Sequence, residues 1–262
     1  MLQRPAVTPL ALATKLAVEA GKFLLRHQPG RRTIAYKGGA GNLVTDMDFA
    51  SEKRIVGAIR RAFPDHAVIA EEGGGRDGTR DRWFIDPLDG TVNYAHGHPI
   101  WCVSIAFESR GRAQYGVVYC PSLDELFVGV RGRGATRNGR RIRCSRATDL
   151  SRAMLCTGFP YERRWKLENL RYWSAFIRAS QAVRRVGSAA LDLCWTAAGV
   201  YDGFWEFHLG PWDIAAAALI AQEAGAKVTD FRGRPVDLFA GEVLAANARM
   251  HAAMKDIIER AK

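Results

Sequence analysis

The stretch Trp83-Phe84-Ile85-Asp86-Pro87-Leu88-Asp89-Gly90-Thr91-Val92-Asn93 decides how the rest of the chain is interpreted. Its apolar start, residues 83–85, predicts a strand that delivers the carboxylates of Asp86 and Asp89 onto a turn. Pro87 fixes one backbone angle between them, and Gly90 allows a sharp turn after them. Mg²⁺ prefers oxygen ligands in a near-octahedral array, which paired carboxylates supply. The backbone N–H groups after Gly90 would open a short helix and face an anion, so we expect metal and phosphate on one loop.

The composition indicates a globular protein. At 262 residues and 29.0 kDa the chain forms one large domain or two packed halves. No run of the sequence reaches the roughly eighteen apolar residues of a membrane span, and residues 1–10 lack the pattern of a secretory signal. The five cysteines are odd in number and never form a C-x-x-C pair, so a disulfide framework or a zinc site is not expected. Reduced thiols in the cytoplasm are the prediction.

A formal net charge of +11 favours anionic partners, either phosphorylated small molecules or nucleic acid. Seven arginines lie within one short segment: Arg131, Arg133, Arg137, Arg140, Arg141, Arg143 and Arg146. Asn138-Gly139 within it predicts a β-hairpin. Two interpretations stay open for this segment. A solvated basic hairpin is favoured over a weak RNA-binding surface, because no aromatic side chains interleave to stack bases.

Apolar periodicity and turn residues divide the chain into helices and strands. Helices are predicted over 9–27, from Asp46 or Asp48 to 63, and over 165–179, 188–198, 212–224 and 248–262. Strands are predicted over 33–36, 43–45, 67–70, 83–85, 102–107, 115–119, 126–130, 154–157, 181–185, 204–207, 227–230 and 243–246. The pattern predicts an α+β half with an antiparallel sheet over 1–145 and an α/β half with helices on a mixed sheet over 146–262, packed as one compact unit.

Two further acidic residues occur where elements begin or end. Glu71 follows the strand over 67–70, and Asp213 opens an alanine-rich helix. Each has a purely structural explanation: Glu71 as an exposed loop residue, and Asp213 as a favourable charge in the first turn of a helix. The residues alone leave both explanations open.

The pattern Asp86-Pro87-Leu88-Asp89-Gly90-Thr91-x-Asn93 resembles the signature of the inositol monophosphatase family, which are Mg²⁺-dependent, lithium-sensitive phosphatases. Other segments that resemble the family follow in the same order: 42–48, 70–72, 186–190, 204–206, 211–213 and 223–225. The similarity runs from about residue 10 to the C-terminus. It implies a layered αβαβα sandwich of the sugar-phosphatase type, usually assembled as a homodimer.

The resemblance also implies roles for individual residues. Two or three Mg²⁺ ions would be held by Glu71, Asp86, the Leu88 carbonyl, Asp89 and Asp213. Asp48 and Thr91 would form a hydrogen-bonded pair and, with Glu71, act on the attacking water, while Gly90 and Thr91 would hold the phosphate. The substrate pocket would be completed by Ser188, Ala189, Glu206 and Lys37.

The function that the resemblance implies is hydrolysis of inositol 1-phosphate, a phosphorylated small polyol, by in-line attack of a metal-activated water. Relatives with the same metal site act on fructose 1,6-bisphosphate, histidinol phosphate or 3′-phosphoadenosine phosphates, and these substrates stay open. Glu206 favours a polyol, because a polyol is selected by acceptors that other ligands would leave unpaired. Val92 and Tyr94 depart from residues common in the family, and neither change removes a ligand.

Overall fold

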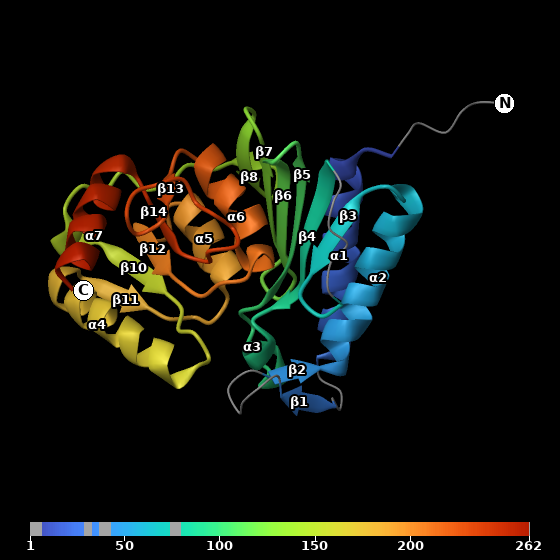
Figure 1. Cartoon of the computed structure of the whole chain (residues 1–262), viewed down its shortest axis with the longest axis horizontal. Helices are drawn as coiled ribbons and strands as arrows, with labels where there is room; N and C mark the ends of the chain where they lie inside the picture. The colour runs from blue at the N-terminus through green and yellow to red at the C-terminus, as the bar shows by residue number, and fades with distance from the viewer. Residues whose placement is uncertain (1–6, 29–32, 37–42, 74–79, 262) are drawn as a thin grey trace.

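Alternating layers of helix and sheet build the molecule (Figure 1). The computed structural model describes residues 7–28, 33–36, 43–73 and 80–261. From right to left in the figure, α1 (Pro9–His27) and α2 (Asp46–Ala62) cover a seven-stranded sheet, and α5 (Ala189–Ala197) and α6 (Pro211–Glu223) form the middle layer. A five-stranded sheet and the outer helices α4 (Arg163–Ala179) and α7 (Ala248–Arg260) follow. The predicted αβαβα order is confirmed.

The seven-stranded sheet has the order β3-β4-β5-β6-β7-β8-β9. Its strands are β3 (Ala67–Ala70), β4 (Asp81–Asp89), β5 (Cys102–Ser109), β6 (Arg112–Cys120), β7 (Glu125–Val130), β8 (Gly134–Arg137) and β9 (Arg140–Arg141). The predicted antiparallel pairing holds everywhere except between β3 and β4, which are parallel. Parallel strands end at the same edge of a sheet. Glu71, which follows β3, therefore lies beside the end of β4, and its N–H donates to the Ile85 carbonyl at 3.3 Å.

Strand β4 is longer than the sequence pattern predicts. Asp86 and Asp89 do not lie on a turn after the strand but within it, opposite Ser104 and Cys102 of β5. The register shifts between the two acids, which marks a bulge at the position of Pro87. A bulge suits proline, since proline has no N–H to give to the ladder. The bulge lets two carboxylates three residues apart lie close together.

The five-stranded sheet has the order β11-β10-β12-β14-β13. Its strands are β10 (Met154–Thr157), β11 (Ala182–Arg184), β12 (Gly203–Glu206), β13 (Lys227–Thr229) and β14 (Val243–Ala246). Strands β11, β10 and β12 are parallel, and β14 pairs antiparallel with both neighbours, as a mixed sheet requires. The remaining short elements are β1 (Ile34–Tyr36), β2 (Leu43–Thr45), α3 (Thr91–Ala95) and the 3₁₀ turn Leu150–Arg152.

The middle helix layer positions the site. Helix α6 is apolar on nearly all sides, which is typical of a helix buried in a core. Its alanines let it approach the large sheet so closely that a Cβ on Gly116 of β6 would lie 3.0 Å from the Ala216 Cα atom. This packing fixes Asp213, in the first turn of α6. Among the described residues, no helix is long and apolar enough to cross a membrane.

Candidate active site

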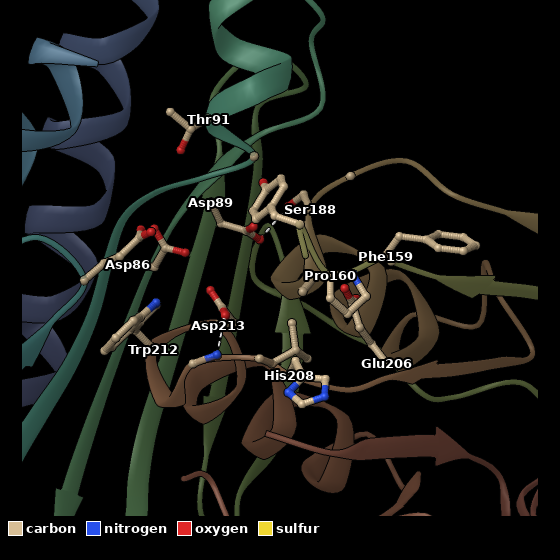
Figure 2. A pocket seen from close by; sticks show the side chains of 18 of the residues that line it. Asp86, Asp89, Thr91, Phe159, Pro160, Ser188, Glu206, His208, Trp212 and Asp213 are labelled. Atoms are coloured by element: carbon tan, nitrogen blue, oxygen red, sulfur yellow. Dashed lines mark hydrogen bonds between the residues drawn. The ribbon is translucent and has the colours of Figure 1, made fainter. Parts of the chain in front are cut away.

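Three carboxylates from two elements converge on one space. Asp86 and Asp89 of β4 and Asp213 of α6 each offer an oxygen, and these atoms lie within 4.8 Å of one another. Figure 2 shows the three side chains directed toward the same space, with Thr91 at the start of the adjacent helix. Asp86 is 1% exposed and Asp89 is 8% exposed. The fold thus concentrates negative charge in a covered place.

The electrostatics of this cluster favour the binding of a cation. Burial raises the pKa of Asp86 well above its ordinary value, and the charges of Glu71, Asp89 and Asp213 raise it further. Burial likewise raises the pKa of Asp89. Buried like charges of this kind are costly unless a cation offsets them. The donors are all carboxylate oxygens, so the set fits a hard divalent cation such as Mg²⁺ rather than a thiolate- or imidazole-seeking metal.

Each carboxylate is oriented by hydrogen bonds from a neighbouring backbone or side chain. Asp86 Oδ1 accepts from the Leu88 N–H at 2.9 Å. Asp89 Oδ2 accepts from the Ser188 hydroxyl at 2.6 Å and from the Ala190 N–H at 2.8 Å, both at the start of α5. Asp213 Oδ2 accepts from the Gly210 N–H at 2.7 Å. Helix starts in the second half of the chain therefore fix acids that belong to both halves.

The turn after β4 joins this cluster to Asp48. Gly90 has φ +91°, and a Cβ there would lie 3.0 Å from the Ile100 carbonyl oxygen, so only glycine fits. The next residue, Thr91, places its hydroxyl 2.9 Å from Asp48 Oδ1 and 3.0 Å from the Leu88 carbonyl oxygen. The single hydroxyl proton can be given to only one of these acceptors at a time.

Asp48 is held by the start of α2. The cap of this helix is Thr45, not Asp46 or Asp48 as the sequence suggested, and Asp48 completes a capping box at the third position. Its Oδ2 accepts from the Thr45 N–H at 2.8 Å and from the Thr45 hydroxyl at 2.6 Å. Burial raises the pKa of Asp48 to about 6, although these hydrogen bonds oppose the rise. Asp48 can therefore exchange a proton near neutral pH.

One cavity of about 220 Å³ contains most of the residues that the sequence singled out. It is lined by Glu71, Asp86, Leu88, Asp89, Gly90, Thr91, Ser188, Ala189, Glu206 and Asp213. Asp48 lies behind Thr91, to which it is hydrogen-bonded. Lys37 lies outside the described residues.

Comparison with known proteins identifies the family. The model of the "Inositol monophosphatase family" matches residues 7–261. The chain belongs to this family. The "Nus factor SuhB" of Pseudomonas aeruginosa is 42% identical over 259 residues, which cover 95% of each chain. The "Inositol-1-monophosphatase" of a Synechocystis species is 40% identical over 258 residues, covering 95% of this chain and 90% of the relative. The solved inositol monophosphatase of Anabaena (Nostoc) superimposes with a TM-score of 0.87 at 40% identity, covering 96% and 95% of the two chains.

Of the predicted substrate residues, Glu206 lines the cavity with its carboxyl group, whereas the Ser188 hydroxyl is already hydrogen-bonded within the protein. Glu206 ends β12 and is 7% exposed. Burial raises its pKa to about 8, with help from the charges of Asp213 and Asp89. The Glu206 carboxylate lies against Gly158, so that a side chain at position 158 would not fit. The Ser188 hydroxyl, by contrast, is used by Asp89 at 2.6 Å.

Several residues at this site have no counterpart in the sequence-based assignment. Asn93 is the last residue of the quoted motif, and its Nδ2 donates to the Ile100 carbonyl at 2.6 Å and to the Val186 carbonyl at 2.7 Å. It thereby ties the turn after β4 to the loop before α5. Phe159, Pro160, Tyr161, Arg185 and Trp212 also line the cavity. Apart from Asn93 and Trp212, which lie within recognisable motifs, no pattern in the sequence marks these residues.

Proposed function

We propose that the protein is a Mg²⁺-dependent phosphate monoester hydrolase whose substrate is inositol 1-phosphate or a closely similar polyol phosphate. The observation that carries the proposal is the convergence of Asp86, Asp89 and Asp213 within 4.8 Å, beside the turn at Gly90 and Thr91. A relative named Inositol-1-monophosphatase, 40% identical, supports the choice of substrate. We also expect the protein to assemble as a homodimer, and light scattering in solution would test this.

The residues that would hold the metal are Glu71, Asp86, Leu88 through its carbonyl, Asp89 and Asp213. When bound, two or three Mg²⁺ ions would neutralise phosphoryl oxygens, lower the pKa of a bound water and stabilise the departing oxygen. Such help is needed because phosphate monoesters hydrolyse extremely slowly without a catalyst.

The proton taken from the attacking water passes to a pair of side chains. The Thr91 hydroxyl donates to Asp48 Oδ1 at 2.9 Å, so Thr91 can accept a proton from water while it gives its own to Asp48. With its pKa raised to about 6, Asp48 is mostly ionised at pH 7 and is still a better base than an ordinary aspartate. Glu71, which lines the same cavity beside Asp86, would help to orient the water.

The shape of the cavity favours a compact alcohol. Its volume of about 220 Å³ is small for a ligand site, since such sites usually offer roughly 300–1,000 Å³. Glu206 at its wall can accept hydrogen bonds from hydroxyl groups. These features support a polyol phosphate over 3′-phosphoadenosine 5′-phosphate, and leave fructose 1,6-bisphosphate and histidinol phosphate as the other candidates.

Phosphate release from these four esters tests the proposal. With Mg²⁺ present, inositol 1-phosphate is expected to give the highest kcat/KM, and Asp86→Asn is expected to abolish turnover because it removes a carboxylate from the cluster. Asp65→Asn is the matched control, since Asp65 is exposed and lies outside the cavity. Near-normal turnover of Asp86→Asn with Mg²⁺ would show that the metal assignment is wrong.

A second candidate function is binding of RNA through the Arg131–Arg146 segment. Strands β8 and β9 form the predicted hairpin, and every arginine of the segment except Arg137 is exposed. A relative at 42% identity is named a Nus factor. We expect RNA binding that weakens steeply with salt and is lost when Arg140, Arg141 and Arg143 are replaced by alanine together. Binding that is insensitive to salt would contradict this role.

A further inference from the structure

The loop between β10 and α4, residues 158–162, lines the same cavity as the acids. Its first residue is fixed by Asn169 of α4, whose Nδ2 donates to the Gly158 carbonyl at 2.6 Å. The Phe159 ring packs against Trp173 with 5.7 Å between the ring centroids. Figure 2 shows Phe159 directed away from the three carboxylates, with Pro160 closer to them. Helix α4 thus anchors a loop whose next side chain, Tyr161, lines the cavity.

Tyr161 faces both the cavity and solvent. The residue as a whole is 43% exposed, yet burial is the main cause that raises the pKa of its phenol. The charges that act on the hydroxyl are those of the metal-site acids Asp89, Asp213 and Glu71 and of Arg185. The phenol group therefore lies close enough to these acids for their charges to act on it.

The Tyr161 hydroxyl makes no hydrogen bond to any residue in the described part of the chain. Its position on the cavity wall means that a bound ligand can supply the missing acceptor. A carboxyl oxygen of Glu206 can accept from one hydroxyl of a bound polyol in either protonation state, and each further hydroxyl both donates and accepts. The remaining hydroxyl oxygens of the polyol can take a donor from elsewhere on the wall.

We propose that Tyr161 determines specificity by donating a hydrogen bond to a hydroxyl oxygen of the alcohol part of the substrate. This inference rests on the proposed function, because it assigns the alcohol side of the same site. Tyr161 and Glu206 then form a complementary pair: the tyrosine donates to the polyol and the glutamate accepts from it. An ester whose alcohol carries no further hydroxyl group gains nothing from Tyr161.

Tyr161→Phe tests this inference, because it keeps the ring and removes only the hydroxyl. We expect kcat/KM for inositol 1-phosphate to fall about tenfold or more, as the loss of one hydrogen bond predicts. For p-nitrophenyl phosphate, whose alcohol has no second hydroxyl, kcat/KM should stay within about twofold. Tyr115→Phe is the matched control, since Tyr115 lies on β6 and does not line the cavity.

Equal kcat/KM values for Tyr161→Phe and the wild type on both esters would overturn the inference. An equal loss on both would also overturn it, since the hydroxyl would then act on the phosphate or the metal site. If the wild type hydrolyses neither ester with Mg²⁺, the proposed function fails. Calorimetric binding of myo-inositol, measured with Mg²⁺ and phosphate present, still tests Tyr161: weaker binding by Tyr161→Phe supports the contact, and unchanged binding refutes it.

Discussion

Replacement of Glu206 by glutamine should change how the stability of the protein depends on pH. In the folded protein the pKa of this carboxyl is raised to about 8 from an ordinary 4.5, first by burial and then by Asp213 and Asp89. Between these two values the folded state holds a proton that the unfolded chain has lost. The free energy of unfolding therefore falls as the pH rises from about 4.5 through about 8. Glu206→Gln stays neutral and lacks this fall.

The size of the effect follows from the two pKa values. Each pKa unit corresponds to about 1.4 kcal/mol. From pH 5 to pH 9 the free energy of unfolding of the wild type should fall by on the order of 4 kcal/mol through the ionisation of Glu206 alone. Urea denaturation in EDTA measures this, because no bound cation then offsets the neighbouring carboxylates. The free energy of unfolding of Glu206→Gln, relative to that of the wild type, should therefore rise by on the order of 4 kcal/mol from pH 5 to pH 9.

The control for this experiment is Glu19→Gln. Glu19 is 60% exposed on α1, so its carboxylate stays in water in both states, and the variant should follow the wild type at each pH. If the free energy of unfolding of Glu206→Gln, relative to that of the wild type, changed by less than about 1 kcal/mol from pH 5 to pH 9, the reasoning would be refuted. That result would mean that Glu206 is ionised and stabilised in the folded protein at neutral pH.

Three further changes have expected outcomes. Gly90→Ala should lower the free energy of unfolding by about 2 kcal/mol or more in urea, whereas Gly97→Ala should cost less, because Gly97 also has a positive φ but no atom lies within 4 Å of its Cβ position. Asn93→Ala should cost about 1–3 kcal/mol by the same assay, because two carbonyls lose their donor; an unchanged midpoint would contradict this. Asp192→Asn should raise the melting temperature at pH 9 more than at pH 6, since burial raises the pKa of this acid, whose carboxylate oxygens accept no hydrogen bond from the described residues, and its ionisation destabilises the folded state. An equal rise at both pH values would count against that assignment.

The layered fold could be predicted because its signals are local. The apolar spacing of residues 9–27 and the Asn138-Gly139 turn each specify one element without help from the rest of the chain. The parallel pairing of β3 with β4 could not be predicted, because the sequences of the two strands do not specify their relative direction. The bulge at Pro87 was hidden for a similar reason: a proline after an acid is equally compatible with a turn.

Most of the acidic site could be predicted because the motifs carry it. Asp86, Asp89 and Asp213 all lie in segments that resemble the family, and the structure brings them within 4.8 Å. The residues on the opposite wall of the cavity could not be found in this way. Tyr161 belongs to a loop without a motif, and the start of that loop is held by Asn169 of α4. Such a contact exists only in three dimensions.

The central position of α5 and α6 has a consequence for synthesis on the ribosome. All strands of the large sheet are complete once Arg141 is made, but the helices that cover its inner face end only at Glu223. At typical translation speeds this gap lasts roughly 4–16 s. During that time the nascent chain lacks the complete helix layer that packs with Phe84, Val118 and Phe127 in the folded core. Aggregation on the ribosome, and the need for a chaperone, should therefore be greatest in this interval.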